Sequence, residues 1–168
     1  MLAMIVLSLF PLAMAYAAIS DLATMTLPNW LSVGLLVLFL ALALGFGLPY
    51  GRLGADVGLG LVVLVAGIGC FAMGWVGGGD VKLAAAIAIW MGTDQILSFL
   101  LLMSVFGGGL AVLLLLFRRL PLPALLATRD WATRLHAPRE GVPYGVALAL
   151  AALTLYPQTA LFGAILAG

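Results

Sequence analysis

The chain has 168 residues, of which 65% are hydrophobic and 8% are charged, and its net charge is +1. A composition this apolar excludes a soluble domain and predicts an integral membrane protein. The small net charge excludes a strongly basic nucleic-acid surface, so we expect no nucleic-acid partner. The single cysteine, Cys70, excludes an internal disulfide and a cysteine-rich zinc module.

Six apolar stretches follow one another along the chain, and each is expected to be an α-helix because only helices satisfy their backbone in lipid. They are predicted near residues 2–20, 29–48, 55–76, 79–92, 95–117 and 143–166. The first contains Ala13-Met14-Ala15, which is similar to a signal-peptidase site, but no Lys or Arg precedes it, so we expect it to be retained. The sequence therefore predicts an all-α, polytopic membrane protein with six transmembrane helices that form one domain over residues 1–168.

Charge placement predicts the orientation of these helices. Five of the seven basic residues fall in the loop over residues 118–142, namely Arg118, Arg119, Arg129, Arg134 and Arg139. By the positive-inside rule this loop is cytoplasmic. Six crossings then place the joints at 21–28 and 77–80 on the cytoplasmic face, and both chain ends on the non-cytoplasmic side. The fourth segment is short enough to be re-entrant instead, but the basic loop and the joint at 77–80 would then lie on opposite faces.

The basic loop and the third predicted helix contain residues that indicate further local features. Leu125, Trp131 and Leu135 among the arginines suit a short helix at the headgroup level, although an ordinary connector explains them equally well. The only histidine, His136, has no metal-ligand or Ser-His-acid spacing around it, so we expect it to be solvated and expect no metal or cofactor. Four glycines predict close packing of the third helix on its neighbours: Gly54, Gly58, Gly67 and Gly69.

The run Gly77-Gly78-Gly79-Asp80 joins two apolar segments and is the most informative feature of the chain. A carboxylate beside hydrocarbon costs about 2.5–3.5 kcal/mol on insertion scales, so it persists mainly where it pairs, lines a wet cavity or performs chemistry. Three glycines end a helix and bring backbone close to whatever Asp80 faces. Taken alone, Asp80 could equally be the N-cap of the fourth helix.

A second acid, Asp21, lies at the end of the first apolar segment, ahead of the turn Leu27-Pro28-Asn29. Alone it reads as an ordinary helix end. Together with Asp80 on one face, it predicts a carboxylate pair that shares one proton. The ionised member can take a proton from water while the protonated member donates to a peptide carbonyl oxygen, which is aspartic-protease chemistry and requires no metal.

These motifs resemble those of the type IV prepilin peptidases, intramembrane aspartic proteases with a Gly-x-Gly-Asp motif. Three stretches carry the resemblance: Ser20-Asp21 with Leu27-Pro28-Asn29, then Gly77-Gly78-Gly79-Asp80-Val81-Lys82-Leu83, and finally Gly141-Val142-Pro143-Tyr144-Gly145-Val146-Ala147. The resemblance implies that Asp21 and Asp80 are the catalytic residues. It implies supporting or substrate-binding positions for Gly77, Gly79, Lys82, Pro143, Tyr144 and Gly145.

Departures from the family pattern refine what the resemblance implies. The long prepilin peptidases have an N-methyltransferase activity and a cytoplasmic insertion with paired cysteines, and this chain has neither that insertion nor those cysteines. It is similar to the short peptidases of tight-adherence (Flp-type) pilus systems. The resemblance thus implies cleavage, without methylation, of a Flp-like prepilin or pseudopilin at the cytoplasmic boundary of the bacterial inner membrane. Membrane lipid and components of a pilus or secretion assembly are the other expected partners.

Several alternatives stay open at this point. Lys82 either extends toward the headgroups or acts in the site, where it would hold a substrate carboxylate or bias the ionisation of the acids. Pro143, Tyr144 and Gly145 form either a plain helix entry or a substrate-binding edge. A small transporter or channel could use the same acids to bind a proton or cation, and a non-catalytic assembly subunit is a third class.

Overall fold

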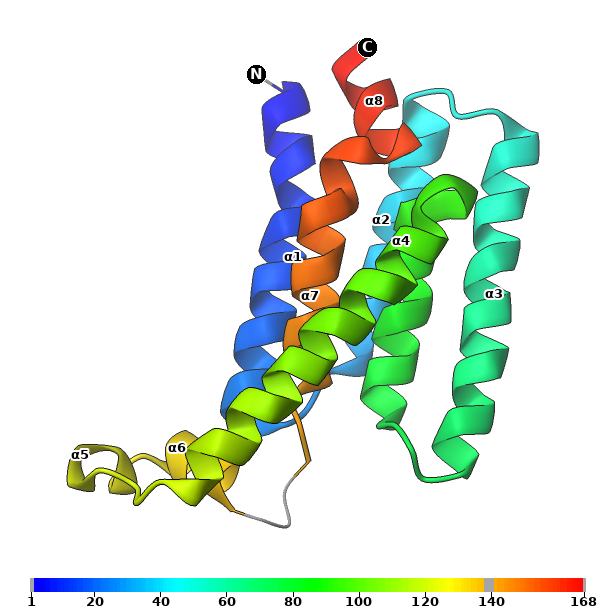
Figure 1. Ribbon diagram of the computed structural model, residues 1–168. Coiled ribbons are helices and arrows are strands. Elements are labelled where there is room, and N and C mark those ends of the chain that lie inside the picture. Colours follow the sequence, from blue (N-terminus) through cyan, green and yellow to red (C-terminus); the bar gives the residue numbers. More distant parts are fainter. Residues whose placement is uncertain (1, 138–140, 168) are drawn as a thin grey trace.

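The computed structural model describes residues 2–137 and 141–167, which form helices and connecting loops. The helices are α1 (Leu2–Thr24), α2 (Asn29–Gly45), α3 (Tyr50–Ala72), α4 (Gly78–Arg119), α5 (Ala124–Ala127), α6 (Asp130–His136), α7 (Tyr144–Leu155), the 3-10 helix η1 (Tyr156–Gln158) and α8 (Ala160–Ala167). They form an upright bundle with α5 and α6 projecting at one end (Figure 1). The predicted all-α class is confirmed for the described residues.

Among the described residues, three helices are long and apolar enough to cross a membrane: α1, α3 and α4. The pair formed by α7 with η1 and by α8 would add a fourth span, bent by 46°. The apolar helix α2 has 17 residues and is shorter than these spans. The structure therefore supports a membrane protein, and the six crossings and the orientation of the chain ends stay predictions.

The fourth and fifth predicted helices are two arms of one element, α4, which is broken at Gly92. Gly92 has φ 64° and ψ −179°, a backbone conformation that essentially only glycine adopts. We call residues 78–91 the first arm and residues 93–119 the second arm. The chain reverses its direction along the bundle between the two arms (Figure 1).

The break in α4 is held by an aspartate of α3. Asp56 is only 2% exposed, and its Oδ1 accepts the backbone N–H of Thr93 at 3.2 Å. Arg52 lies 3.7 Å from the Asp56 carboxylate through its Nε and also pairs with Asp94 just after the break. Because α3 starts at Tyr50 and not near residue 55 as predicted, Arg52 and Asp56 lie one turn apart on the same helix. This cluster ties α3 to the start of the second arm.

Close packing of α3 uses different glycines from those expected. A Cβ on Gly67 would lie 2.6 Å from Val81, and one on Gly60 would collide with Ile89, so both glycines let the first arm of α4 approach α3. A Cβ on Gly54, Gly58 or Gly69 would meet nothing within 4 Å, so the expectation holds for Gly67 alone. The physical reason is helical periodicity: Gly60 and Gly67 are seven residues apart and therefore share one face of α3.

The end of α1, the start of α4 and the start of α7 lie at one end of the bundle, opposite the chain ends, and we call it the aspartate end (Figure 1). The basic loop forms two short helices at this end, of which α6 packs against α1 and α4 and α5 packs against α6. α6 buries Ala132 and Leu135, and Arg118 donates to the carbonyl oxygens of Leu135 at 2.8 Å and Gly141 at 3.0 Å.

The expectation of a solvated His136 is wrong. Its Nε2 hydrogen-bonds the carbonyl oxygen of Leu120 at 2.8 Å, and its ring packs edge-on against Phe117 with centroids 5.3 Å apart. The side chain is therefore partly buried and ties α6 to the end of α4. Local sequence does not show this role, because the partners of His136 come from residues sixteen and more positions earlier.

We predict that Gly92→Ala destabilises the protein by about 1–3 kcal/mol, because alanine is strained at this φ and ψ. Its Cβ would also come within 2.9 Å of the Asp56 carboxylate. The thermal unfolding midpoint in detergent measures the effect. Gly109→Ala is the matched control on the second arm, because its Cβ would meet nothing within 4 Å. Equal midpoints for the two variants would contradict a strained, tightly held break.

Candidate active site

Asp21 lies in the last turn of α1, not in the joint after it, because α1 continues to Thr24. The helix ends where Met25 adopts φ 55° and donates its N–H to the Asp21 carbonyl oxygen at 2.8 Å, a left-handed C-terminal cap. The Asp21 side chain is 5% exposed, and its Oδ2 accepts the backbone N–H of Gly145 at 2.6 Å. The acid of the first motif thus binds the start of α7.

Gly145 is the position that lets α7 approach Asp21 so closely. A Cβ there would lie 2.8 Å from Asp21 Oδ2 and 3.0 Å from Asp21 Cβ. Any side chain would therefore displace the carboxylate or the helix. The hydrogen bond also benefits from the helix start, where N–H groups have no intrahelical acceptor and the macrodipole favours an anion.

Asp80 is the third residue of α4, and the N-cap position belongs to Gly77. The alternative that Asp80 is the N-cap is therefore wrong. Its side chain folds back toward that cap: a Cβ on Gly77 would lie 2.8 Å from Asp80 Oδ2. A carboxylate at the third helical position can reach the N-cap backbone in this way, and the helix dipole favours it there.

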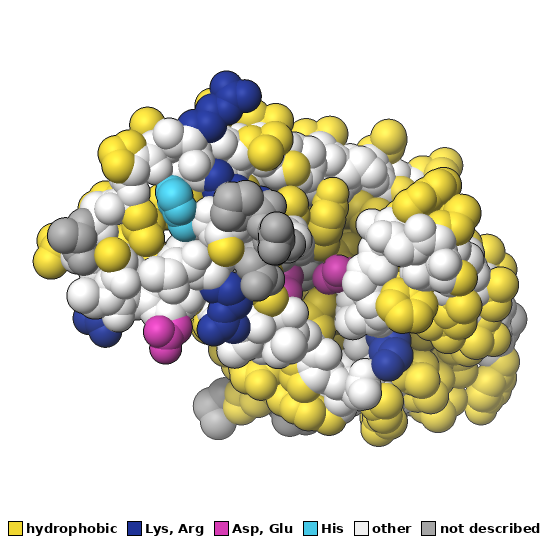
Figure 2. Space-filling view, turned by 90° about the horizontal axis from the view of Figure 1, so that it is seen from below, with side chains coloured by type: hydrophobic (Ala, Val, Ile, Leu, Met, Phe, Trp, Pro, Cys, Tyr) yellow, Lys and Arg dark blue, Asp and Glu magenta, His cyan; other side chains and the backbone are white. Residues whose placement is uncertain are grey.

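The structure brings all three sequence motifs together at the aspartate end. The Asp21 and Asp80 carboxylates are close enough to interact electrostatically. Gly79 packs on the turn of the first motif, since a Cβ there would lie 3.1 Å from Leu27 Cβ. Figure 2, which looks onto this end, shows acidic atoms side by side near the middle of the face.

An open groove of about 720 Å³ runs from Asp80 between α3, both arms of α4 and α7. Its walls are aliphatic over most of their length, for example at Leu59, Val63, Ile96, Leu100, Met103 and Leu148. Asp80 is the only charged residue among the described side chains that line it. We call it the Asp80 groove. Its shape offers a long apolar surface with a carboxylate at one end.

Tyr144 joins this groove to the buried acid. It is the first residue of α7, 40% exposed, and lines the Asp80 groove, while the next residue, Gly145, binds Asp21. Its ring packs over Gly107 of the second arm, where a Cβ would lie 2.7 Å from the ring. Pro143, which precedes α7, is buried.

Lys82 lies apart from the two acids, although it is only two residues from Asp80. Its Nζ donates to Asn29 Oδ1 at 2.8 Å, and it lines a separate pocket between α2, α3 and the first arm. Two residues correspond to about 200° around a helix, so the two side chains project to nearly opposite sides of α4.

Three residues of the site region were not predicted from the sequence: Leu27 against Gly79, Gly107 under Tyr144, and Cys70 in the wall of the Asp80 groove. Leu27 belongs to the first sequence motif, so that motif could have indicated its place in the site. Gly107 and Cys70 lie in apolar stretches that carry no local signal. Among the described residues, no cluster of three or more His, Cys, Asp or Glu side chains is placed to hold a metal ion.

The type IV leader peptidase family matches the chain over residues 8–112, which is more than half of its length. The match includes Asp21, Asp80 and the glycines before Asp80, whereas Pro143, Tyr144 and Gly145 lie outside it. No curated protein and no solved structure matches the chain. The family match agrees with the membrane-compatible helices and with the meeting of the two motifs at one end of the bundle. The chain therefore belongs to the type IV leader peptidase family, whose members are proteases that act on prepilin-type leaders.

Proposed function

We propose that this protein is an intramembrane aspartic endopeptidase in which Asp21 and Asp80 form the catalytic pair. It cleaves the leader of a Flp-like prepilin or pseudopilin where the precursor's helix leaves the inner membrane on the cytoplasmic side. The observation that carries the proposal is that both acids lie at the aspartate end within range of each other's charge: Asp21 accepts the N–H of Gly145, and Asp80 lies at the end of an apolar groove.

The two carboxylates share one proton, because two neighbouring groups of like charge do not both ionise readily. The ionised carboxylate takes a proton from water, and the water oxygen attacks the carbon of the scissile peptide bond. The protonated carboxyl donates its proton to the carbonyl oxygen as negative charge develops there. When the tetrahedral intermediate collapses, the C–N bond breaks and a proton passes to the leaving amine. The aspartates then return to the singly protonated pair.

The Asp80 groove supports a substrate that is itself an apolar helix. Its aliphatic walls offer the precursor's helix a surface inside the membrane, and the acid at its end meets the chain where it emerges. A helical peptide bond is a poor protease substrate because its carbonyl and N–H are already paired, so the precursor must unwind beside Asp80. Tyr144 at the start of α7 lines the same groove as Asp80, which supports a role for it in contacting the unwound segment.

We predict that Asp21→Asn and Asp80→Asn each lower cleavage at least about 10²-fold, the lower end of the range for general acid–base groups. Processing of a co-expressed Flp-type precursor, scored by gel mobility and by the rate with purified protein in detergent, measures the loss. Asp130→Asn is the matched control, since Asp130 is exposed on α6. Normal maturation in both variants would exclude the pair.

Mass spectrometry of the wild-type product should show an unmethylated N-terminus.

We predict that Gly145→Ala lowers kcat about 10- to 100-fold with a smaller change in KM, because its methyl group displaces Asp21 and small misplacements of a catalytic group are costly. Gly77→Ala should act in the same way on Asp80. Gly141→Ala is the control, because its Cβ would meet nothing within 4 Å. Unfolding midpoints show whether each variant stays folded. A folded Gly145→Ala variant with unchanged kcat would argue against positioning of Asp21 by α7.

We predict that Cys70 forms a disulfide with a single cysteine placed in the apolar helix of the precursor, because Cys70 lines the Asp80 groove and is half-buried. The experiment uses the Asp80→Asn variant, because a precursor that is not cleaved stays bound during oxidation. The control is a Cys70→Ser, Val37→Cys variant, whose cysteine lies exposed on α2 outside the groove. Equal cross-linking at both positions would show that the groove does not select the precursor.

A further inference from the structure

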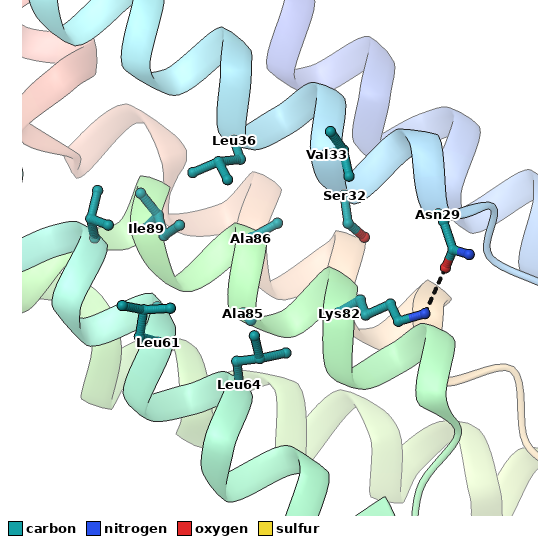
Figure 3. A pocket seen from close by; sticks show the side chains of 12 residues that line it. Asn29, Ser32, Val33, Leu36, Leu61, Leu64, Lys82, Ala85, Ala86 and Ile89 are labelled. Atoms are coloured by element: carbon teal, nitrogen blue, oxygen red, sulfur yellow. Dashed lines mark hydrogen bonds between the residues drawn. The ribbon is translucent and has the colours of Figure 1, made fainter.

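A second groove, of about 330 Å³, lies on the other side of the first arm of α4, between α2 and α3 (Figure 3). Its walls are apolar, with Val33, Leu36, Leu61, Leu64 and Ile89 among them. Neither Asp21 nor Asp80 lines it. The proposed peptidase reaction therefore leaves this groove without a role. We call it the Lys82 groove.

The polar groups of the Lys82 groove gather at one end. Lys82, Asn29 and Ser32 lie together there, whereas the labelled side chains farther along are aliphatic (Figure 3). Lys82 Nζ donates to Asn29 Oδ1 at 2.8 Å, which holds the ammonium at the groove end. An ammonium has three N–H donors, so two are left for a ligand. Lys82 is the only charged residue among the described lining residues.

The position of this polar end matches the depth of lipid headgroups. Lys82 is in the first turns of α4, two residues after Asp80, and Asn29 is the first residue of α2, so both lie at the aspartate end of two apolar helices. Lys side chains at helix ends hold their ammonium at the membrane interface while the stem covers apolar surface. An ammonium at that depth attracts the phosphate of a lipid, and the aliphatic walls beyond it suit an acyl chain.

We propose that the Lys82 groove binds one anionic phospholipid, with its phosphate at Lys82 and an acyl chain along the walls formed by α2, α3 and the first arm. Charge selects the headgroup: the only charged side chain in the lining is positive, so an anionic lipid is favoured over one that carries its own ammonium. Lys82 and Asp80 share the start of α4, and a lipid bound here supports that helix from the side opposite to Asp80.

Native mass spectrometry of the whole protein in detergent tests the site, with phosphatidylglycerol and phosphatidylcholine of equal chain length as probes. We expect wild-type protein to bind phosphatidylglycerol about fivefold more tightly, which corresponds to roughly 1 kcal/mol for one interfacial lysine. Lys82→Met should remove the preference and Lys82→Arg should keep it. Arg119→Met, which removes an exposed charge from the same end of the bundle, should also keep it.

A second pair of variants tests the acyl-chain walls. Leu61→Trp should weaken the binding of both lipids by filling the groove, whereas Val65→Trp, also exposed on α3 but outside the lining, should not. The proposal is overturned if Lys82→Met retains the preference, or if Leu61→Trp and Val65→Trp behave alike. Competition by inorganic phosphate at the lipid's own concentration would identify the anion alone as the ligand and would likewise overturn it.

The precursor helix is the competing occupant of this groove. A Cys70→Ser, Leu61→Cys variant that forms a disulfide with the precursor would assign the Lys82 groove to the substrate and overturn the lipid site. Absence of that disulfide, together with the lysine-dependent preference, supports the lipid. Lipid binding is measured without peptide cleavage, so these results are independent of whether Asp21 and Asp80 are catalytic.

Discussion

A carboxylate inside an apolar helical bundle has little water around it, so it needs donors from the protein. Three aspartates among the described residues each lie against the start of a helix, and two of them, Asp21 and Asp56, accept a backbone N–H there. Asp21 binds the start of α7, Asp80 folds back on the start of α4, and Asp56 binds the start of the second arm. Helix starts provide unpaired N–H groups and the positive end of the macrodipole. The tertiary structure is organised around these contacts.

Glycine makes each contact sterically feasible. A Cβ on Gly145, Gly77 or Gly92 would lie 2.8, 2.8 or 2.9 Å from the nearest carboxylate oxygen. The same device has different consequences at the two ends of the bundle. Asp56 is nearly inaccessible and paired with Arg52, so it joins α3 to α4. Asp80 lines an open groove near a second acid and is thus available to a substrate.

The first arm of α4 divides the molecule into two grooves of opposite charge. Asp80 is the charged residue of one and Lys82 of the other, because side chains two positions apart project to nearly opposite sides of a helix. The ammonium binds Asn29 and does not neutralise the acid beside it in sequence. In the proposed enzyme, this separation keeps the shared proton under the control of the two carboxylates. With the proposed lipid in the Lys82 groove, the same separation would give the lipid and the substrate different surfaces of the first arm of α4.

Much of the framework could be predicted because it depends on local residue type. Composition predicts a helical membrane protein, and the glycines before Asp80 with the acid at Asp21 predict the family. The ends of the helices were harder to predict from the sequence. Helix α1 includes Asp21 because it ends only at the left-handed residue Met25. Helix α4 includes two of the predicted helices, and the contact between Asp56 and Thr93 holds the break between them. The surroundings of His136 and the glycines that pack α3 also depend on remote partners.

The sequence by itself thus determined the class of the protein, its two candidate acids and their glycine-rich setting. Only the tertiary structure decided which groups those acids meet. The Gly145 N–H that binds Asp21 comes from a residue 124 positions away, and the bond exists because α7 packs on α1. Likewise, the direction in which Lys82 projects depends on how α4 is rotated against α2 and α3. Such contacts result from the packing of whole helices, and a local pattern of residues carries no information about the atoms that the packing brings together.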